Sequence, residues 1–182
     1  MNILVVGGGG REHAIAASLS KSPLTKRLVV APGNPGIETL AECHPVAAND
    51  ILGQCKLARD IKADFVFIGP EIPLVLGLKD ELLKLGISAF GPSKNAAQLE
   101  GSKTFSRNFC ERHNIPQPQF KYCTNIEAAK KEIELLNGYC VVKADGLAAG
   151  KGVTIVKNNK IAIKTLKNIF KAKNKNEKIL IE

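Results

Sequence analysis

The sequence predicts an α/β protein in which a parallel sheet with helices on both faces is followed by a smaller α+β unit. Short apolar runs, such as 2–6 and 65–68, alternate with segments of helical spacing. These runs are apolar throughout, which is typical of parallel strands that are buried on both faces. Gly and Pro follow the runs closely, so the chain is divided into strand–loop–helix steps.

The elements of the first region follow from local signals. Its strands are expected at 2–6, 28–30, 65–68 and 87–90. Its helices are expected at 12–21, 50–62, 73–86, from 93 onward, and 103–113. Asp50, Ser93 and Ser102 are residue types that cap helix N-termini, and Pro73 suits a first helical position. Ligands of such sheets bind at the carboxyl ends of the strands, so four loops are candidate binding loops: 7–12, 31–36, 69–73 and 91–93.

The second region begins after a break marked by Pro116 and Pro118, so we expect domains at 1–117 and 118–182. Its elements are expected as strand 119–123, helix 126–136, strand 140–143, strand 153–156, helix 161–171 and strand 179–181. The two strands that directly flank the glycine-rich loop are expected to pair antiparallel, because no crossover helix separates them.

Composition excludes some classes of protein. The 182 residues are 45% hydrophobic and 24% charged, close to globular averages, so the chain is not disordered as a whole. The net charge of +9 is concentrated in 157–178, which holds eight Lys and one acid, Glu177. No Arg or aromatic cluster accompanies these Lys, so we expect a solvated surface and no nucleic-acid partner.

The cysteines and the apolar runs indicate a cytoplasmic protein. The five Cys are odd in number and no pair has metal-ligand spacing, which predicts reduced thiols and no metal site. No apolar run approaches the ~20 residues that span a bilayer, and the N-terminus lacks the pattern of a signal peptide, so no membrane partner is expected.

The first glycine loop, 7–10, lies between a predicted strand and a predicted helix and suits an anion. A dinucleotide fingerprint fails here, because its third glycine would fall on Glu12 or His13 and no acid ends the second strand. The loop therefore predicts phosphate binding without a dinucleotide, with Arg11 as a nearby cation. A tight turn without a ligand is the alternative.

The second glycine loop runs from Lys143 to Gly152 as KADGLAAGKG. It is not a P-loop, because only three residues separate Gly146 from Gly150, Gly152 replaces Ser or Thr, and a strand follows. A Gly/Ala loop between two strands can instead cover a nucleoside triphosphate, with Lys143 and Lys151 supplying charge. A plain hairpin loop is the alternative.

Six stretches together resemble one family, phosphoribosylamine–glycine ligase (glycinamide ribonucleotide synthetase), of the ATP-grasp superfamily. They are Gly9–Ala14, Ala31–Asn34, Gly69–Glu71 with Pro73–Val75, Gly91-Pro92, Ala96–Lys103 and Lys143–Gly152. Each stretch alone is weak, but together they come in the family's order and spacing over essentially the whole chain.

The resemblance implies a fold and a reaction. Residues 1–117 would form a Rossmann-like substrate domain, and 118–182 the ATP-grasp lid subdomain. The family joins glycine to 5-phosphoribosylamine in purine biosynthesis, using ATP and Mg²⁺ or Mn²⁺. It forms glycinamide ribonucleotide, ADP and phosphate through a glycyl phosphate intermediate.

The resemblance also implies site residues. Phosphoribosylamine would contact Gly8, Gly9, Gly10, Arg11, Glu12, His13, Gly69, Pro70 and Glu71. ATP would contact Lys103, Lys143, Asp145, Gly146, Leu147, Ala148, Ala149, Gly150, Lys151, Gly152 and Glu182. Within that second set, both Lys103 and Lys143 would reach the phosphates, 146–152 would be a mobile lid, and Glu182 would lead into the adenine contact.

The chain ends where the family's central ATP-grasp lobe should begin. The lobes that lie beyond are expected to hold the catalytic residues, the metal ligands, most of the adenine pocket and the glycine site, and a separate chain could carry them. The prediction is therefore a ligase part that is not active alone. The alternatives are a non-catalytic remnant that binds a phosphoribosyl ligand or nucleotide, and a dinucleotide-binding oxidoreductase.

Overall fold

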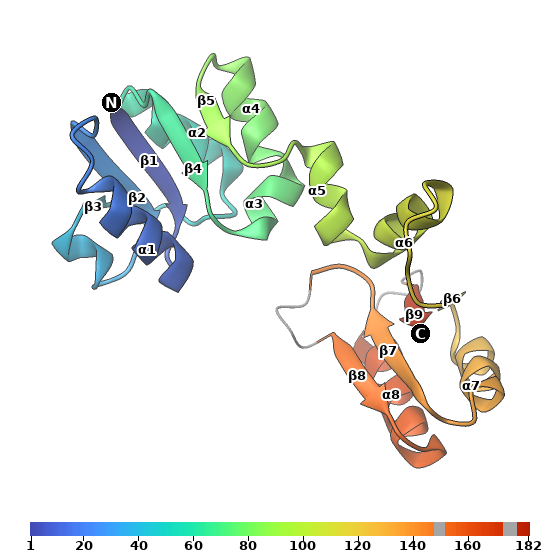
Figure 1. Cartoon of the computed structure of the whole chain (residues 1–182). Coiled ribbons are helices and arrows are strands. Elements are labelled where there is room, and N and C mark those ends of the chain that lie inside the picture. Colours follow the sequence, from blue (N-terminus) through green and yellow to red (C-terminus); the bar gives the residue numbers. More distant parts are fainter. Residues whose placement is uncertain (148–151, 173–177) are drawn as a thin grey trace. The chain divides into compact units, whose positions relative to one another are not determined.

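The computed structural model describes residues 1–147, 152–172 and 178–182. It divides the chain into two compact units, Met1–Gln98 and Leu99–Glu182 (Figure 1). No described helix is both long enough and apolar enough to cross a membrane. Each unit has its own sheet and its own hydrophobic core residues.

The first unit contains a five-stranded sheet of order β3-β2-β1-β4-β5, and every strand pair is parallel. Its strands are β1 (Asn2–Gly7), β2 (Arg27–Pro32), β3 (Glu42–Cys43), β4 (Phe65–Ile68) and β5 (Ser88–Phe90). The predicted parallel sheet is therefore confirmed. The register pairs Gly7 with Pro32 and Val6 with Ile68, so the loops after β1, β2 and β4 leave the same edge.

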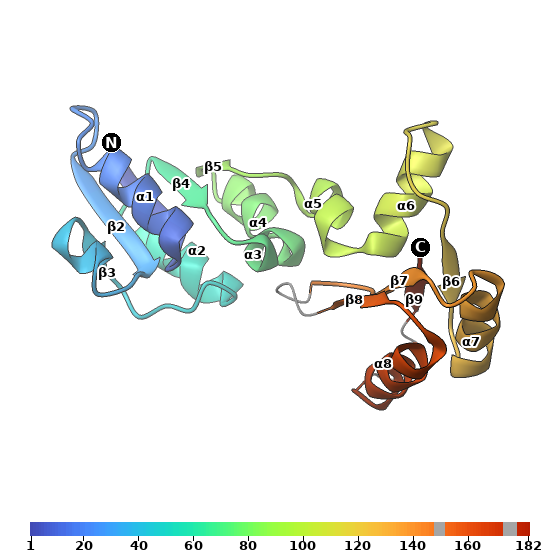
Figure 2. The same cartoon turned by 60° about the horizontal axis from the view of Figure 1, so that its bottom comes forward.

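Helices cover both faces of this sheet, as predicted (Figure 2). The helices are α1 (Gly10–Leu19), η1 (Ile37–Thr39), α2 (Ile51–Asp60), α3 (Glu71–Leu76), α4 (Leu78–Lys84) and α5 (Lys94–Gly101), of which the last crosses the division between the units. Leu4 of β1 packs in the core under α2 and α4, whereas its neighbour Val5 packs in the core under α1 and η1. Both side chains are fully buried.

Some local predictions were wrong. The single helix expected over 73–86 is two helices, because Gly77 adopts a left-handed backbone with φ 96° between α3 and α4. The short elements η1 and β3 were not predicted. In contrast, the Asp50 cap is confirmed, since its side chain accepts a hydrogen bond from Gly53 N at 2.9 Å.

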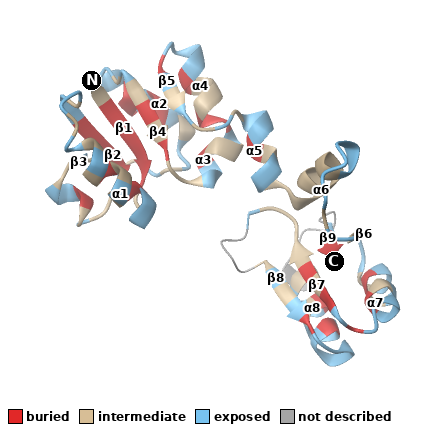
Figure 3. Ribbon diagram, viewed as in Figure 1, coloured by how far each residue is buried: buried red, intermediate tan, exposed pale blue. Residues whose placement is uncertain are grey.

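The second unit holds a four-stranded antiparallel sheet of order β6-β9-β7-β8. Its elements are α6 (Lys103–Arg112), β6 (Lys121–Cys123), α7 (Ile126–Leu135), β7 (Cys140–Ala144), β8 (Val153–Val156), α8 (Asn159–Ala172) and β9 (Ile179–Ile181). The predicted antiparallel pairing of β7 with β8 is confirmed. Ile133 of α7, Leu166 of α8 and Ile181 of β9 meet in its buried core (Figure 3).

The contact-based division at 98/99 lies earlier than the domain boundary predicted near residue 117. Polar contacts account for the difference, because α6 is bound to the second sheet. Thr104 O accepts a hydrogen bond from the Tyr122 hydroxyl of β6 at 3.1 Å, and Arg107 of α6 pairs with Glu182 after β9. A separate folding domain at 1–117 stays a prediction.

Candidate functional site

Three loops of the first unit meet at the carboxyl edge of its sheet. The glycine loop after β1 contacts the loop after β2 through two hydrogen bonds, from Gly33 N to Gly7 O at 3.1 Å and from Asn34 Nδ2 to Gly8 O at 2.9 Å. The approach is close, since a Cβ on Gly8 would lie 2.3 Å from Gly33 O. Three of the four candidate loops, 7–12, 31–36 and 69–73, thus lie together at this edge, and their binding of a ligand stays a prediction.

Glu12 lies inside this cluster of loops and is only 3% exposed. Its Oε2 accepts a hydrogen bond from Gly9 N at 2.7 Å, and its Oε1 accepts one from Arg11 Nε at 2.9 Å. A Cβ on Gly69, in the loop after β4, would lie 2.2 Å from Glu12 Oε1. The carboxylate therefore fills a space that exists only because its neighbours are glycines.

Arg11 links the first loop to the third. Its guanidinium also donates from Nη1 to Glu71 Oε1 at 3.1 Å, and about half of the Arg11 side chain stays exposed. The two carboxylates raise the pKa of Arg11 above its usual value, chiefly through the hydrogen bond to Glu12. The pKa of Glu71 is lowered first by a hydrogen bond from the backbone N–H of Glu71 to its own carboxylate, and then by the hydrogen bond from Arg11. Both side chains are charged at neutral pH.

The remaining predicted residues of this unit lie around the same loops. Gly10 begins α1, Pro70 precedes α3, and half-buried His13 packs against the loop after β2, since a Cβ on Gly36 would lie 2.7 Å from its Cε1. His13 therefore lies at the border of the cluster of loops and not at its centre. The first N–H groups of α1 precede the helix's first internal hydrogen bond, which His13 N donates to Gly9 O.

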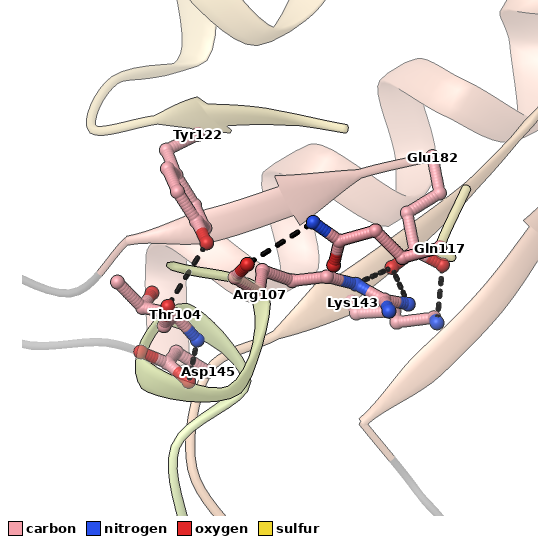
Figure 4. A network of polar contacts seen from close by, with 7 residues as sticks. All are labelled: Thr104, Arg107, Gln117, Tyr122, Lys143, Asp145 and Glu182. Carbon is pink, nitrogen blue, oxygen red and sulfur yellow. Dashed lines mark hydrogen bonds and ion pairs between the residues drawn. The ribbon is translucent and has the colours of Figure 1, made fainter. Parts of the chain in front are cut away.

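In the second unit, Asp145 follows β7 and caps α6 (Figure 4). Its Oδ1 accepts hydrogen bonds from Lys103 N at 2.7 Å, Thr104 N at 3.3 Å and Gly146 N at 2.9 Å. Burial alone would raise the pKa of Asp145, but the hydrogen bonds from Thr104, Gly146 and Lys103 outweigh it and lower that pKa. Lys103 Nζ in turn donates to Gly146 O at 2.8 Å.

Glu182 lies between two cations. Its carboxylate, with 7% of the side chain exposed, pairs with Lys143 Nζ of β7 and with the guanidinium of Arg107, whose Nε is 2.7 Å from Oε1 (Figure 4). Burial tends to raise the pKa of Glu182, but the hydrogen bonds from Lys143 and Arg107 dominate and lower it. The group carries one net positive charge.

Sequence reasoning missed four members of the polar network drawn in Figure 4: Thr104, Arg107, Gln117 and Tyr122. Gln117 Nε2 donates to Arg107 O at 3.1 Å, and burial raises the pKa of Tyr122 to about 12. Arg107 could have been found, because it lies four residues after Lys103 and so on the same face of a helix. Tyr122 gave no such signal, because its partner Thr104 is remote in sequence.

The predicted lid residues Ala148, Ala149, Gly150 and Lys151 lie outside the described residues. The flanking Leu147 is exposed and Gly152 is half buried. Within the described ranges, no three His, Cys, Asp or Glu side chains come together as metal ligands would. The described sites offer backbone N–H groups and cations, which suit phosphate groups.

A parallel α/β unit with a glycine loop is followed by an antiparallel sheet whose strand β7 carries Lys143, and a match to an ATP-grasp domain over residues 101–182 places the chain in the ATP-grasp class. In agreement, the chain superposes on a phosphoribosylamine–glycine ligase from Thermotoga maritima with a TM-score of 0.76 at 27% identity. The superposition covers 100% of this chain and 43% of that structure. An N5-carboxyaminoimidazole ribonucleotide synthetase solved with ADP shares the fold, with a TM-score of 0.72 at 21% identity over 98% of this chain and 46% of that one. The chain belongs to the phosphoribosylglycinamide synthetase family, whose N domain matches residues 1–100 and whose ATP-grasp (A) domain matches residues 101–182.

Relatives within this family are longer than the chain. Phosphoribosylamine–glycine ligase of Phenylobacterium zucineum is 49% identical over 158 residues, which are 87% of this chain and 37% of that protein. The ligase of Caulobacter vibrioides is 50% identical over 155 residues, which are 85% of this chain and 36% of that protein. The chain therefore spans little more than a third of the length of these relatives.

Proposed function

We propose that the chain supplies the phosphoribosylamine site and the phosphate-covering part of the ATP site of a phosphoribosylamine–glycine ligase. The match of both family domains across residues 1–182 is the observation that carries this proposal. It is supported by the two clusters of polar groups, one at the carboxyl edge of the first sheet and one between α6 and β7. Together the whole enzyme would convert glycine, 5-phosphoribosylamine and ATP into glycinamide ribonucleotide, ADP and phosphate.

The chemistry requires an activated carboxyl group, because an amine does not displace oxide from a carboxylate. Transfer of the γ-phosphoryl group of ATP to a glycine oxygen gives glycyl phosphate and ADP. The amine of phosphoribosylamine then attacks the acyl carbon, loses a proton and expels phosphate. Cations that neutralise the transferring group and a cover that excludes water are what this reaction asks of a protein.

In this proposal the first unit holds the amine substrate. The N–H groups at the start of α1 would bind the phosphate of the amine substrate, near Arg11 and its partner Glu71. The backbones of Gly8, Gly9, Gly10, Gly69 and Pro70 would line the substrate, and His13 would border it. Glu12 would act indirectly rather than as the expected contact, because it is buried and both of its carboxylate oxygens accept hydrogen bonds from the protein.

The second unit would hold the ATP phosphates through Lys103 and Lys143, with residues 146–152 covering them. Lys143 donates to Glu182 in the structure, and its ammonium group has two further N–H donors for a phosphate. Arg107 pairs with the same carboxylate, so Glu182 would stay neutralised if Lys143 turned toward a phosphate. Asp145 would fix the relative position of the Lys103 and Gly146 backbones.

The catalytic groups, the glycine site and the ligands for Mg²⁺ or Mn²⁺ would come from the part of the relatives that extends beyond this chain. The metal would neutralise charge on the transferring phosphoryl group. A separate chain carrying those lobes is a proposed partner, and a cytoplasmic location is proposed with it. The second candidate is a non-catalytic remnant that binds a phosphoribosyl ligand or a nucleotide.

The test is ADP release by the purified 182-residue chain with MgATP, glycine and phosphoribosylamine generated in place, each omitted in turn. We expect no ADP above background from the chain alone and substrate-dependent ADP once the remaining lobes of a relative are added as a second polypeptide. Lys143→Gln should abolish the restored activity, whereas Glu127→Gln, an exposed control, should not change it. Failure of complementation together with binding of ribose 5-phosphate would favour the remnant.

A further inference from the structure

We infer that Glu12 is a positioning residue that sets the shape of the phosphate-binding loop and does not itself contact the substrate. The inference rests on the proposed phosphoribosyl site, which it deepens. A glutamate beside a glycine loop would ordinarily be assigned to a hydroxyl or amine of the ligand. The geometry of this one assigns it to the protein.

Burial is the first argument. Glu12 is 3% exposed, whereas Arg11 before it and Glu71 across from it are exposed by about half of their side chains. Both Glu12 oxygens already have partners, Gly9 N at 2.7 Å and Arg11 Nε at 2.9 Å. A buried carboxylate whose two oxygens each accept a hydrogen bond is held in place by the protein, and its 3% exposure leaves little surface for a ligand.

The glycines around the carboxylate are the second argument. An added Cβ would lie 2.6 Å from Glu12 Cγ if placed on Gly7, 3.0 Å from Oε2 if placed on Gly9, and 2.2 Å from Oε1 if placed on Gly69. Gly69 has no positive φ, so its lack of a side chain is needed for space alone. Two loops from different strands, after β1 and after β4, thus have glycine where the Glu12 side chain lies.

The consequence concerns the N–H groups left for an anion. Glu12 takes the Gly9 N–H, which fixes the peptide that leads into α1. The next N–H groups, from Gly10 and Arg11, belong to the first turn of α1 and therefore have no intrahelical acceptors. Through Arg11 and on to Glu71, the same carboxylate holds the loops after β1 and β4 together. Removing it should loosen both loops at once.

The experiment uses the full chain and follows its backbone amides by NMR. Glu12→Ala should speed hydrogen exchange at Gly9 N by at least about tenfold and shift the amides of 69–71, because a hydrogen bond to a charged group is lost. Gly69→Ala should reproduce both effects without touching Glu12. Glu12→Gln keeps an acceptor for Gly9 and should show a smaller effect, and Glu81→Ala, which removes an exposed carboxylate elsewhere in the unit, should show none.

Two probes separate positioning from direct contact: inorganic phosphate and ribose 5-phosphate. A positioning residue predicts that Glu12→Ala weakens both by the same factor, about tenfold or more. A loss confined to ribose 5-phosphate would identify Glu12 as a ligand contact and overturn the inference. So would unchanged exchange at Gly9 N. If the unaltered chain binds neither probe while Gly9 exchange still depends on Glu12, the proposed phosphoribosyl site fails and the positioning role stands.

Discussion

Asp145 and Glu182 are carboxylates that the second unit holds in their charged form. Asp145 receives three backbone N–H donors and Glu182 receives two cations, and in both residues these contacts outweigh the cost of burial. Their pKa values lie below the ordinary values of 3.8 and 4.5. Stability linked to them is therefore present above those ordinary values and is lost as the pH falls toward the lowered folded-state values.

We predict that the free energy of unfolding of the second unit is flat above about pH 5 and falls in more acidic solution. The unfolded chain takes up these protons more readily than the folded chain, which sets the sign. Urea titrations followed by tyrosine absorbance measure this, because both tyrosines, Tyr122 and Tyr139, lie in the second unit.

Asp145→Asn and Glu182→Gln should each lower the free energy of unfolding at pH 7. Each should also make the fall of that free energy in acidic solution, called the acid limb, less steep. Glu127→Gln, with an exposed side chain, is the control and should leave the acid limb unchanged. An unchanged acid limb in both buried-site variants would show that these carboxylates do not drive the pH dependence.

At the scale of elements, the boundaries of α6, α3 and α4 are set by contacts and backbone conformation at the helix ends. Ser102 caps α6 by accepting from Phe105 N at 3.1 Å, while Asp145 takes the two N–H groups before it. This start of α6 is thus satisfied partly from its own sequence and partly from the end of β7. The division between α3 and α4 rests instead on one residue, Gly77.

We predict that Gly77→Ala lowers the stability of the first unit by roughly 1–2 kcal/mol, because a left-handed backbone costs that much for a residue with a Cβ. Gly77→Asn is the matched variant at the same position and should cost less, since Asn tolerates this conformation better. Thermal unfolding followed by circular dichroism measures both. A stabilising Gly77→Ala would mean that α3 and α4 form one continuous helix in solution.

At the scale of the molecule, two sheets of different type have separate cores: the parallel sheet has one on each face, and the antiparallel sheet has its own. Leu4 is fully buried in the parallel sheet and Leu166 is fully buried against the antiparallel sheet. Each core is complete within its own unit. The two proposed binding regions are likewise each built from residues of one unit.

We predict that core truncations act on one unit at a time. Leu4→Ala should cost about 2–5 kcal/mol and speed amide exchange in residues 1–98, and Leu166→Ala should do the same in 99–182. Residue-resolved hydrogen exchange distinguishes the two. Lys164→Ala, an exposed change on the same helix as Leu166, is the control. Loss of protection in both units from either truncation would show a single cooperative unit.

The sequence by itself determined the parallel sheet, the antiparallel pair around the second glycine loop and the family. These depend on local patterns: continuous apolar runs, glycine loops between specific elements, and caps such as Asp50 and Ser102. Tertiary structure alone decided which polar groups meet. Glu12 with Gly69, Asp145 with the start of α6, and Arg107 with Glu182 are pairs far apart in sequence. Their contacts depend on how strands and helices pack, and the spacing of two residues along the sequence does not tell how far apart they lie in the folded protein.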